Sequence, residues 1–253
     1  MSIRAMDTFG PIADLYESVR PGYPPEIADA ILAHHGSTPT SVVEVGAGTG
    51  KGTDVLARVG APLTCIEPDP RMAALLAGRF PNARIHPTTF EQWSPPAGGV
   101  AVLACAMAWH WLAPATRNTR ARRALAPGGT LAVFGHRYGY ADAAQGAAIR
   151  SALHVIDPTV RERPMDWFYQ DIVDQGQFDD VRREFFGRDL RLDKEQYLGL
   201  VRTFGLYLSR PPAQQQRAIT SLGRVVDDSG GTVVLDLRTT LVLARAGRQA
   251  RAG

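Results

Sequence analysis

The sequence predicts an α/β fold built on a mostly parallel, buried sheet. A short β-branched run, Ser41–Val45, breaks abruptly into alternating glycines and is followed by helical spacing up to Val59. Two further apolar runs, Leu63–Ile66 and Val100–Ala104, are typical of strands, and the continuous second run is expected in a strand buried on both faces. The 253 residues, 45% of them hydrophobic, fit one such domain with an insertion more easily than two independent domains.

The glycines at 46, 48 and 50 indicate a ligand site of the nucleotide type. Gly46, Gly48 and Gly50 can adopt positive φ and leave no Cβ between the backbone and a ligand. A helix is expected over roughly residues 49–59. Its first-turn amides, with the positive end of the helix dipole, would face the crevice above the sheet.

The glycine spacing separates three ligand classes. A P-loop is excluded, because Val45 stands where its first glycine belongs and Gly52 where its Mg²⁺-binding hydroxyl belongs. The dinucleotide fingerprint Gly-x-Gly-x-x-Gly is disfavoured, because Lys51 takes the place of the third glycine. What remains is acid-x-Gly-x-Gly-x-Gly, with Glu44 as the acid. Glu67, at the end of the second strand, is placed to accept both ribose hydroxyls of an adenosine.

At these residues the chain resembles the class I S-adenosylmethionine-dependent methyltransferases, whose first motif reads hydrophobic, acid, hydrophobic, Gly-x-Gly-x-Gly. The resemblance covers roughly residues 9–136, with weaker similarity to the end of the chain. Within this family, the chain is similar to the small-molecule branch that includes trans-aconitate methyltransferase-like proteins. The segments that carry the resemblance beyond the glycines are Tyr16-x-x-x-Arg20-Pro21-Gly22-Tyr23-Pro24, Glu67–Met72, Thr89–Glu91, Ala106–Trp111 and Leu125–Thr130.

The resemblance implies a Rossmann-like methyltransferase fold. Its mostly parallel sheet would have seven strands and an antiparallel last strand, with helices on both faces, an N-terminal lid and a helical insertion after the fifth strand. Along the chain we expect a lid and cap over residues 1–36, a cofactor-binding core over 37–140, acceptor-covering helices over 141–228, and a closing strand and tail over 229–253.

The resemblance also implies S-adenosylmethionine as cofactor and S-adenosylhomocysteine as product. Residues 9–24 would fold over the methionine end as a lid, and a plain N-terminal cap is the alternative. Met72 is placed to touch the adenine or, equally well, to fill the core. Phe90 departs from the small residue of the family pattern, which alters the expected pocket. The expected cofactor-binding residues are Tyr16, Arg20, Glu44, Gly46, Ala47, Gly48, Gly50, Glu67, Pro68, Met72, Thr89, Phe90, Glu91 and Ala106.

A histidine between two tryptophans follows the central strand. Ligands of open α/β sheets bind beyond the carboxyl ends of the strands, so Trp109 and Trp111 are expected to face the methyl acceptor. His110 is the candidate base or acceptor orienter, and a histidine that only fixes the loop is the alternative. Arg137 is either a partner for an acidic acceptor or a surface charge. Tyr23 completes the expected acceptor-binding set.

The composition favours a cytoplasmic protein with a small-molecule ligand. No apolar run approaches the roughly 18 residues of a membrane span, and the N-terminus lacks the apolar core of a signal peptide. The net charge of +3 comes from arginines scattered among acids, so no nucleic-acid partner is expected. Cys65 and Cys105 fall in predicted buried strands, which favours free thiols over a disulfide or metal site. We expect a monomer or a homodimer.

The predicted function is methyl transfer from S-adenosylmethionine to an O, N or C atom of a small molecule, such as a carboxylic acid or a secondary metabolite. Two alternatives stay open. One is a protein that binds S-adenosylmethionine without methyl transfer, as a regulator or as a scaffold for another reaction. The other is a nicotinamide-dependent oxidoreductase, which the missing third glycine disfavours.

Overall fold

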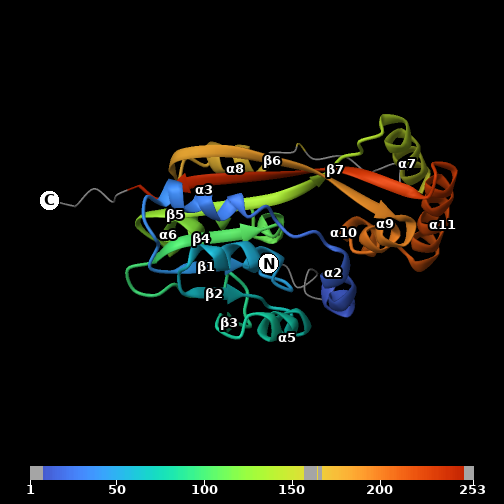
Figure 1. Cartoon of the computed structure of the whole chain (residues 1–253). Coiled ribbons are helices and arrows are strands. Elements are labelled where there is room, and N and C mark those ends of the chain that lie inside the picture. Colours follow the sequence, from blue (N-terminus) through green and yellow to red (C-terminus); the bar gives the residue numbers. More distant parts are fainter. Residues whose placement is uncertain (1–7, 157–163, 165–166, 248–253) are drawn as a thin grey trace.

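Seven strands form one sheet in the computed structural model, which describes residues 8–156, 164 and 167–247. The strand order is β3-β2-β1-β4-β5-β7-β6. The pairs from β3 through β5 are parallel, whereas β7 runs antiparallel to both β5 and β6 (Figure 1). The predicted mostly parallel sheet of seven strands with an antiparallel last strand is therefore confirmed.

Strands β1, β2 and β4 follow the apolar runs of the sequence closely, and β4 is buried at six consecutive positions. β5 begins at Leu125, five residues before the apolar run that starts at Thr130, because Leu125 already pairs with Val100 ahead of a register irregularity. The strands are β1 Val42–Val45, β2 Leu63–Ile66, β3 Arg84–His86, β4 Val100–Ala106, β5 Leu125–Tyr138, β6 Asp179–Asp193 and β7 Thr232–Arg245.

Helices cover both faces of the sheet. On one face, α3 and α4 bury Ile31 and Leu56 against the central strands. On the other, α6 and α8 bury Ala121 and Ile172. The helical elements are η1 Gly10–Ile12, α2 Ala13–Val19, α3 Glu26–His35, α4 Lys51–Leu56, η2 Ala57–Val59, α5 Pro70–Arg79, η3 Trp109–Trp111, α6 Arg117–Ala124, α7 Ala143–Ile156, α8 Trp167–Asp174, α9 Lys194–Val201, α10 Gly205–Leu208 and α11 Pro212–Asp228.

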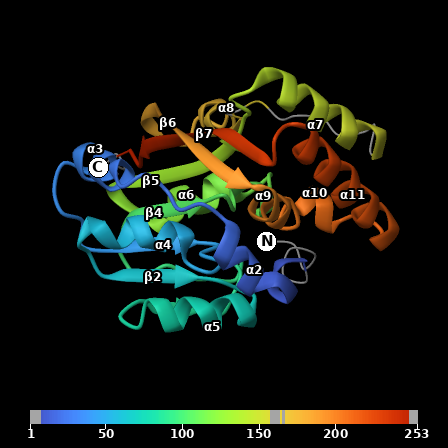
Figure 2. The ribbon, with the colours of Figure 1, turned by 45° about the vertical axis from the view of Figure 1, so that its right-hand side comes forward.

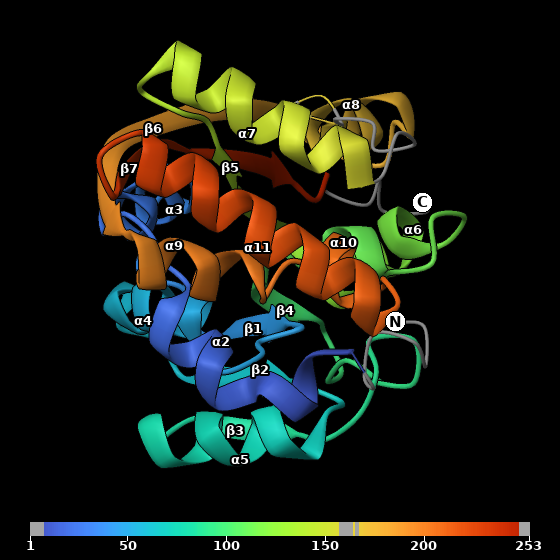
Figure 3. The same cartoon turned by 90° about the vertical axis from the view of Figure 1, so that its right-hand side faces the viewer.

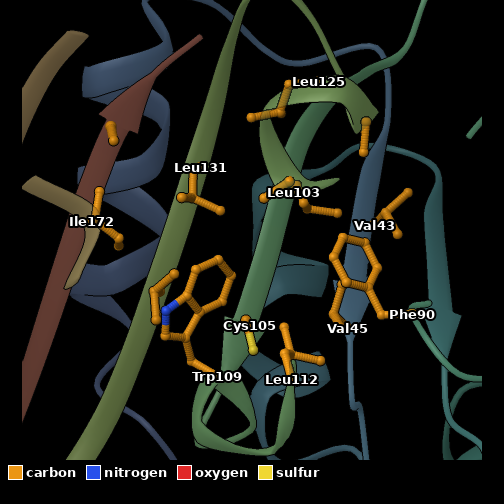
Figure 4. Close-up of a cluster of buried hydrophobic side chains, with 14 of the residues drawn as sticks. Val43, Val45, Phe90, Leu103, Cys105, Trp109, Leu112, Leu125, Leu131 and Ile172 are labelled. Carbon is orange, nitrogen blue, oxygen red and sulfur yellow. The ribbon is translucent and has the colours of Figure 1, made fainter. Parts of the chain in front are cut away.

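The core on the α6 and α8 face extends to the end of β4. Trp109 and Leu112 belong to the same buried cluster as Val43 and Leu103 (Figure 4). Trp109 is only 2% exposed and Leu112 only 1%. The loop after β4 is therefore anchored in the core by buried side chains.

The helical insertion follows β5, as predicted. α7 and α8 lie between β5 and β6, and α9, α10 and α11 lie between β6 and β7. α7, α9 and α11 bury Ile149, Tyr197 and Leu222 in a cluster of their own. This helical group gathers at one end of the sheet, beside α2 (Figure 2).

The N-terminal segment bridges the sheet and the helical group. It folds as η1 followed by the seven-residue helix α2. The Glu17 carboxylate forms ion pairs with Lys51 of α4, at 2.9 Å, and Arg79 of α5, at 3.0 Å. On its other side α2 packs so tightly on α9 that a Cβ at Gly199 would lie 3.1 Å from Val19 (Figure 3).

Cys65 and Cys105 are buried free thiols, as predicted. Burial raises the pKa of both thiols, which keeps them protonated and unreactive. Within the described ranges, no helix is both long and apolar enough to cross a membrane.

Candidate functional site

A cavity of about 910 Å³ opens at the carboxyl ends of β1, β2, β4 and β5. It joins the glycine loop to the aromatic residues of the helical insertion, and residues of the N-terminal segment complete its wall. The predicted site residues that line it are Tyr16, Arg20, Gly46, Gly48, Glu67, Met72, Ala106, Trp109, His110, Trp111 and Arg137.

The glycine loop contributes bare backbone to the wall. Gly46 has a φ of 68°, and a Cβ there would lie 2.5 Å from the Cβ of Ala108. Gly48 has a φ of 57°, and its N–H donates to Glu67 Oε2 at 2.8 Å. The Gly46 N–H donates to the Ile66 carbonyl at 2.8 Å. The loop after β1 is thus fixed by hydrogen bonds to the end of β2.

The Glu67 carboxylate has the capacity to accept two ligand hydroxyls. Its Oε1 accepts from the Asp69 N–H at 2.9 Å and its Oε2 from Gly48. Each carboxylate oxygen offers two acceptor positions, so one remains on each after these bonds. Burial raises the pKa of Glu67 to about 7, although the two amide hydrogen bonds oppose the shift.

Asp69 is a cavity residue that the sequence analysis missed. It is 3% exposed and caps α5, where its Oδ1 accepts from the N–H groups of Arg71, at 2.8 Å, and Met72, at 3.4 Å. Burial alone would raise the pKa of Asp69, but hydrogen bonds from Arg71 and Met72 lower it. An aspartate directly before Pro70 is a helix-start signal that could have identified it.

Eight predicted site residues are not among the described residues that line the cavity. Phe90 is 3% exposed, and its ring packs on that of Trp93. A Cβ at Gly50 would lie 2.5 Å from Phe80, so this glycine faces α5. The Tyr23 ring stacks on His136 with a centroid distance of 4.2 Å. The full set is Tyr23, Glu44, Ala47, Gly50, Pro68, Thr89, Phe90 and Glu91.

Glu44 lies behind the glycine loop, beneath the start of α4. It is fully buried, and its Oε2 accepts from Thr53 Oγ1 at 2.5 Å. A Cβ at Gly52 would lie 2.3 Å from its Oε1, which has no hydrogen-bond partner among the described residues. Burial raises the pKa of Glu44 to about 8. Glu44 therefore supports α4 and does not contact the cavity.

The aromatic loop after β4 begins at a strained residue. Met107 has a φ of 53°, a conformation that non-glycine residues seldom adopt. Its Sδ accepts from the His136 N–H at 3.2 Å. The ring of Trp111 lies 5.9 Å from that of Phe9 in an edge-on contact, and the His110 ring lies 4.8 Å from that of Trp111. The N-terminal segment thus touches the loop predicted to face the acceptor.

A buried ion pair between Arg117 and Asp171 fixes this loop to α6 and α8. Asp171 of α8 accepts from Trp109 Nε1 at 2.9 Å, from Arg117 Nε at 3.0 Å and from Asn118 Nδ2 at 2.9 Å. Partial burial alone would raise the pKa of Asp171, but the hydrogen bonds from Arg117, Trp109 and Asn118 lower it. The aromatic loop after β4, α6 and α8 are consequently held together by hydrogen bonds to one carboxylate.

The rest of the wall comes from residues without a local sequence signal. They lie on β5, in the helical insertion and around α10, and are brought together by tertiary packing alone. Residues of this kind include Tyr138, Tyr140, Arg150, Trp167, Phe168 and Phe204.

Comparison with known proteins identifies the domain. Residues 42–129 match the family model of a methyltransferase domain. An uncharacterized methyltransferase of Mycobacterium tuberculosis is 35% identical over 124 residues, 49% of this chain and 50% of that protein. The trans-aconitate 2-methyltransferase of Rhizobium meliloti is 40% identical over 93 residues, 36% of each chain. The chain thus spans about half the length, or less, of these curated relatives.

The fold comparison covers more of the chain. The solved structure of a candidate type II methyltransferase from Anaeromyxobacter dehalogenans superposes on this chain with a TM-score of 0.67. It is 14% identical and covers 90% of this chain and 97% of its own. The fold is that of the class I methyltransferases. Residues 42–129 match the methyltransferase domain family, and the resemblance seen in the sequence is confirmed.

Replacing Asp171 with Asn should destabilise the protein by roughly 3–5 kcal/mol, because it leaves the Arg117 guanidinium, with a 7% exposed side chain, without its counter-ion. Urea denaturation at pH 7 measures this. Asp174→Asn, on the exposed side of the same helix, is the matched control and should change stability by less than about 0.5 kcal/mol. Because the pKa of Asp171 is lowered, the difference should shrink as the pH falls below the ordinary carboxyl range. Equal stability of D171N and D174N would contradict the anchoring role.

Replacing Glu44 with Gln should flatten the pH dependence of stability. The pKa of Glu44 rises from 4.5 to about 8 on folding, so its contribution is fully present below pH 4.5 and is lost as the pH rises through 8. Gln mimics the protonated form at every pH. At pH 9, E44Q should therefore be more stable than the wild type, by an amount on the order of a few kcal/mol, with little difference at pH 5. Denaturant titrations at pH 5, 7 and 9 test this, and parallel curves would show that Glu44 does not titrate in this range.

Proposed function

We propose that the protein transfers a methyl group from S-adenosylmethionine to a small-molecule acceptor. The observation that carries the proposal is one continuous cavity that joins the Gly46, Gly48 and Glu67 wall to the aromatic loop Trp109–Trp111. The methyltransferase domain over residues 42–129 supports it. A carboxylic acid or a secondary metabolite is the expected kind of acceptor, and the name of the Rhizobium meliloti relative indicates an acid as its own substrate.

The residues at the β1 and β2 ends fit the cofactor. Gly46 and Gly48 offer a surface without side chains to its amino-acid part, and the free acceptor positions of Glu67 match two ribose hydroxyls. Met72, 5% exposed, lies beside them on the wall. When bound, S-adenosylmethionine supplies an electrophilic methyl group on a sulfonium.

The residues at the β4 end would orient the acceptor. Tyr16 and Trp111 present aromatic faces, which stabilise a nearby cation such as a sulfonium. His110 lines the same wall and is the candidate base or orienter. Holding two reactants in line can lower the barrier by as much as about 7–11 kcal/mol, so positioning by this loop would supply most of the catalysis. Residues 37–140 would hold the cofactor, and residues 141–228 would cover the acceptor.

The proposal is tested by supplying S-adenosylmethionine with a panel of small acids, amines and phenols and measuring the release of S-adenosylhomocysteine. Release that depends on one class of acceptor supports methyl transfer. Tight cofactor binding with no release across the panel would favour the alternative of a binding protein without transferase activity. Preferential binding of a nicotinamide cofactor would favour the oxidoreductase.

Glu67→Gln should weaken S-adenosylhomocysteine binding roughly tenfold to a hundredfold. A charged hydrogen bond contributes roughly 1.5–3 kcal/mol, and Gln has one acceptor oxygen where Glu has two. Isothermal titration calorimetry at pH 8.5, above the raised pKa of Glu67, gives the dissociation constant. Glu26→Gln, at an exposed position of α3, is the control and should bind as the wild type does. An unchanged dissociation constant for E67Q would place the ribose elsewhere.

Gly48→Val should abolish cofactor binding while the protein stays folded. The valine side chain would enter the cavity beside Met72 and would resist the φ of 57°. Gly60→Val is the matched control, since Gly60 has a φ of 76° and no atom lies within 4 Å of the position that a Cβ would take there. Both variants should lose a similar roughly 1–2 kcal/mol of stability. Only G48V should lose binding; equal binding by both would mean that the glycine loop is merely a turn.

A further inference from the structure

Acidic and basic side chains line different parts of the cavity. Among its described lining residues, both carboxylates, Glu67 and Asp69, follow β2. The three arginines, Arg20, Arg137 and Arg150, lie after α2, on β5 and on α7. Strands β1 and β4 separate β2 from β5 in the sheet, so acidic and basic groups occupy different ends of the cavity. The basic end favours an anion.

Arg20 is held rigidly at this basic end. Its Nε donates to Thr203 Oγ1 at 2.8 Å, its Nη2 to the Thr203 carbonyl at 2.6 Å and its Nη1 to Tyr138 Oη at 3.3 Å. Thr203 is fully buried. These bonds use three of the five N–H donors of the guanidinium. One donor on each terminal nitrogen therefore stays available, a pair that suits the two oxygens of a carboxylate.

Arg20 has no acidic counter-ion in the part of the chain that the structure describes. Its guanidinium carbon lies 5.0 Å from the ring centre of Tyr16, 4.8 Å from that of Phe204 and 6.0 Å from that of Tyr138. Its surroundings are thus aromatic faces, hydroxyls and one carbonyl. A guanidinium partly withdrawn from water without a counter-ion carries a desolvation cost, which an anionic ligand offsets.

The partners of Arg20 place it at the acceptor end. Tyr138 is the last residue of β5, and Thr203 lies between α9 and α10. Tyr138 thus ends a strand that β4 separates from β1 and its glycine loop, whereas the family resemblance implied that Arg20 serves the methionine end of the cofactor. The rings of Tyr16, Phe204 and Tyr138 lie around Arg20, and Trp111 and Trp167 line the same cavity.

We propose that the methyl acceptor is a small organic carboxylate with an aromatic or long apolar body, and that Arg20 binds its carboxylate. The body would lie along the aromatic wall formed by Trp111, Trp167 and Phe204. This inference rests on the proposed methyl transfer, because it assigns the second half of the same cavity to the second substrate.

The test uses three carboxylates, trans-cinnamate, indole-3-acetate and octanoate, each beside its neutral primary amide. Each is titrated calorimetrically into the wild type saturated with S-adenosylhomocysteine. At least one acid should bind ten times more tightly than its amide. In Arg20→Gln this preference should vanish, while the dissociation constant of S-adenosylhomocysteine changes less than threefold. Arg58→Gln, at an exposed position of η2, is the matched control and should keep both affinities.

Other outcomes overturn the inference. If R20Q weakens S-adenosylhomocysteine binding and keeps the acid preference, Arg20 serves the cofactor. If the amides bind as tightly as the acids, or none of the acids binds the wild type, the acceptor is not an apolar carboxylate. Should R20Q fail to fold, Arg20→Lys is used instead. Lysine keeps the charge but lacks the paired N–H donors of the guanidinium, so it must reduce the acid preference at least threefold. S-adenosylhomocysteine is also titrated alone into the wild type. Failure of that binding would count against methyl transfer itself, whereas loss of the acid preference alone would count only against the role of Arg20.

Discussion

The candidate site depends on the way in which the end of β2 fixes the loop after β1. The Ile66 carbonyl accepts the N–H groups of Gly46 and Ala47, and the Glu67 carboxylate accepts that of Gly48. Two neighbouring strands thus end in one hydrogen-bonded unit. This unit forms the acidic wall of the cavity, and the aromatic loop after β4 packs against it where Ala108 meets Gly46. Even the Cβ of an alanine would not fit at Gly46 in that contact.

Features set by neighbouring residues could be predicted from the sequence. The runs that became β1, β2 and β4, the glycines with positive φ and the buried thiols are local patterns, because burial on both faces of a parallel sheet requires continuous apolar residues. The early start of β5 could not be predicted. It follows from the pairing of Leu125 with Val100, and the Pro127-Gly128-Gly129 turn gives no indication of it.

The end of the cavity formed by β4, β5 and the helical insertion could be predicted only in part, because its contacts join distant segments. Trp109 and Trp111 were identifiable from their place after a central strand, but the ion pair between Arg117 and Asp171, 54 residues apart, left no local pattern. Arg20 and Thr203 are 183 residues apart. The sequence therefore predicted Arg20 as a ligand-binding residue but could not predict its hydrogen bonds to Thr203.

The position of Glu17 gives the N-terminal segment an electrostatic tether. Its carboxylate bridges Lys51 and Arg79, on two different helices of the core, while α2 rests on α9 through apolar contact alone at Gly199. Partly exposed ion pairs weaken as dissolved salt screens them, whereas apolar contacts do not. On the α9 side, Arg20 adds hydrogen bonds to Thr203, which is uncharged. Raising the ionic strength should therefore weaken the attachment of α2 to α4 and α5 before its attachment to the α9 side.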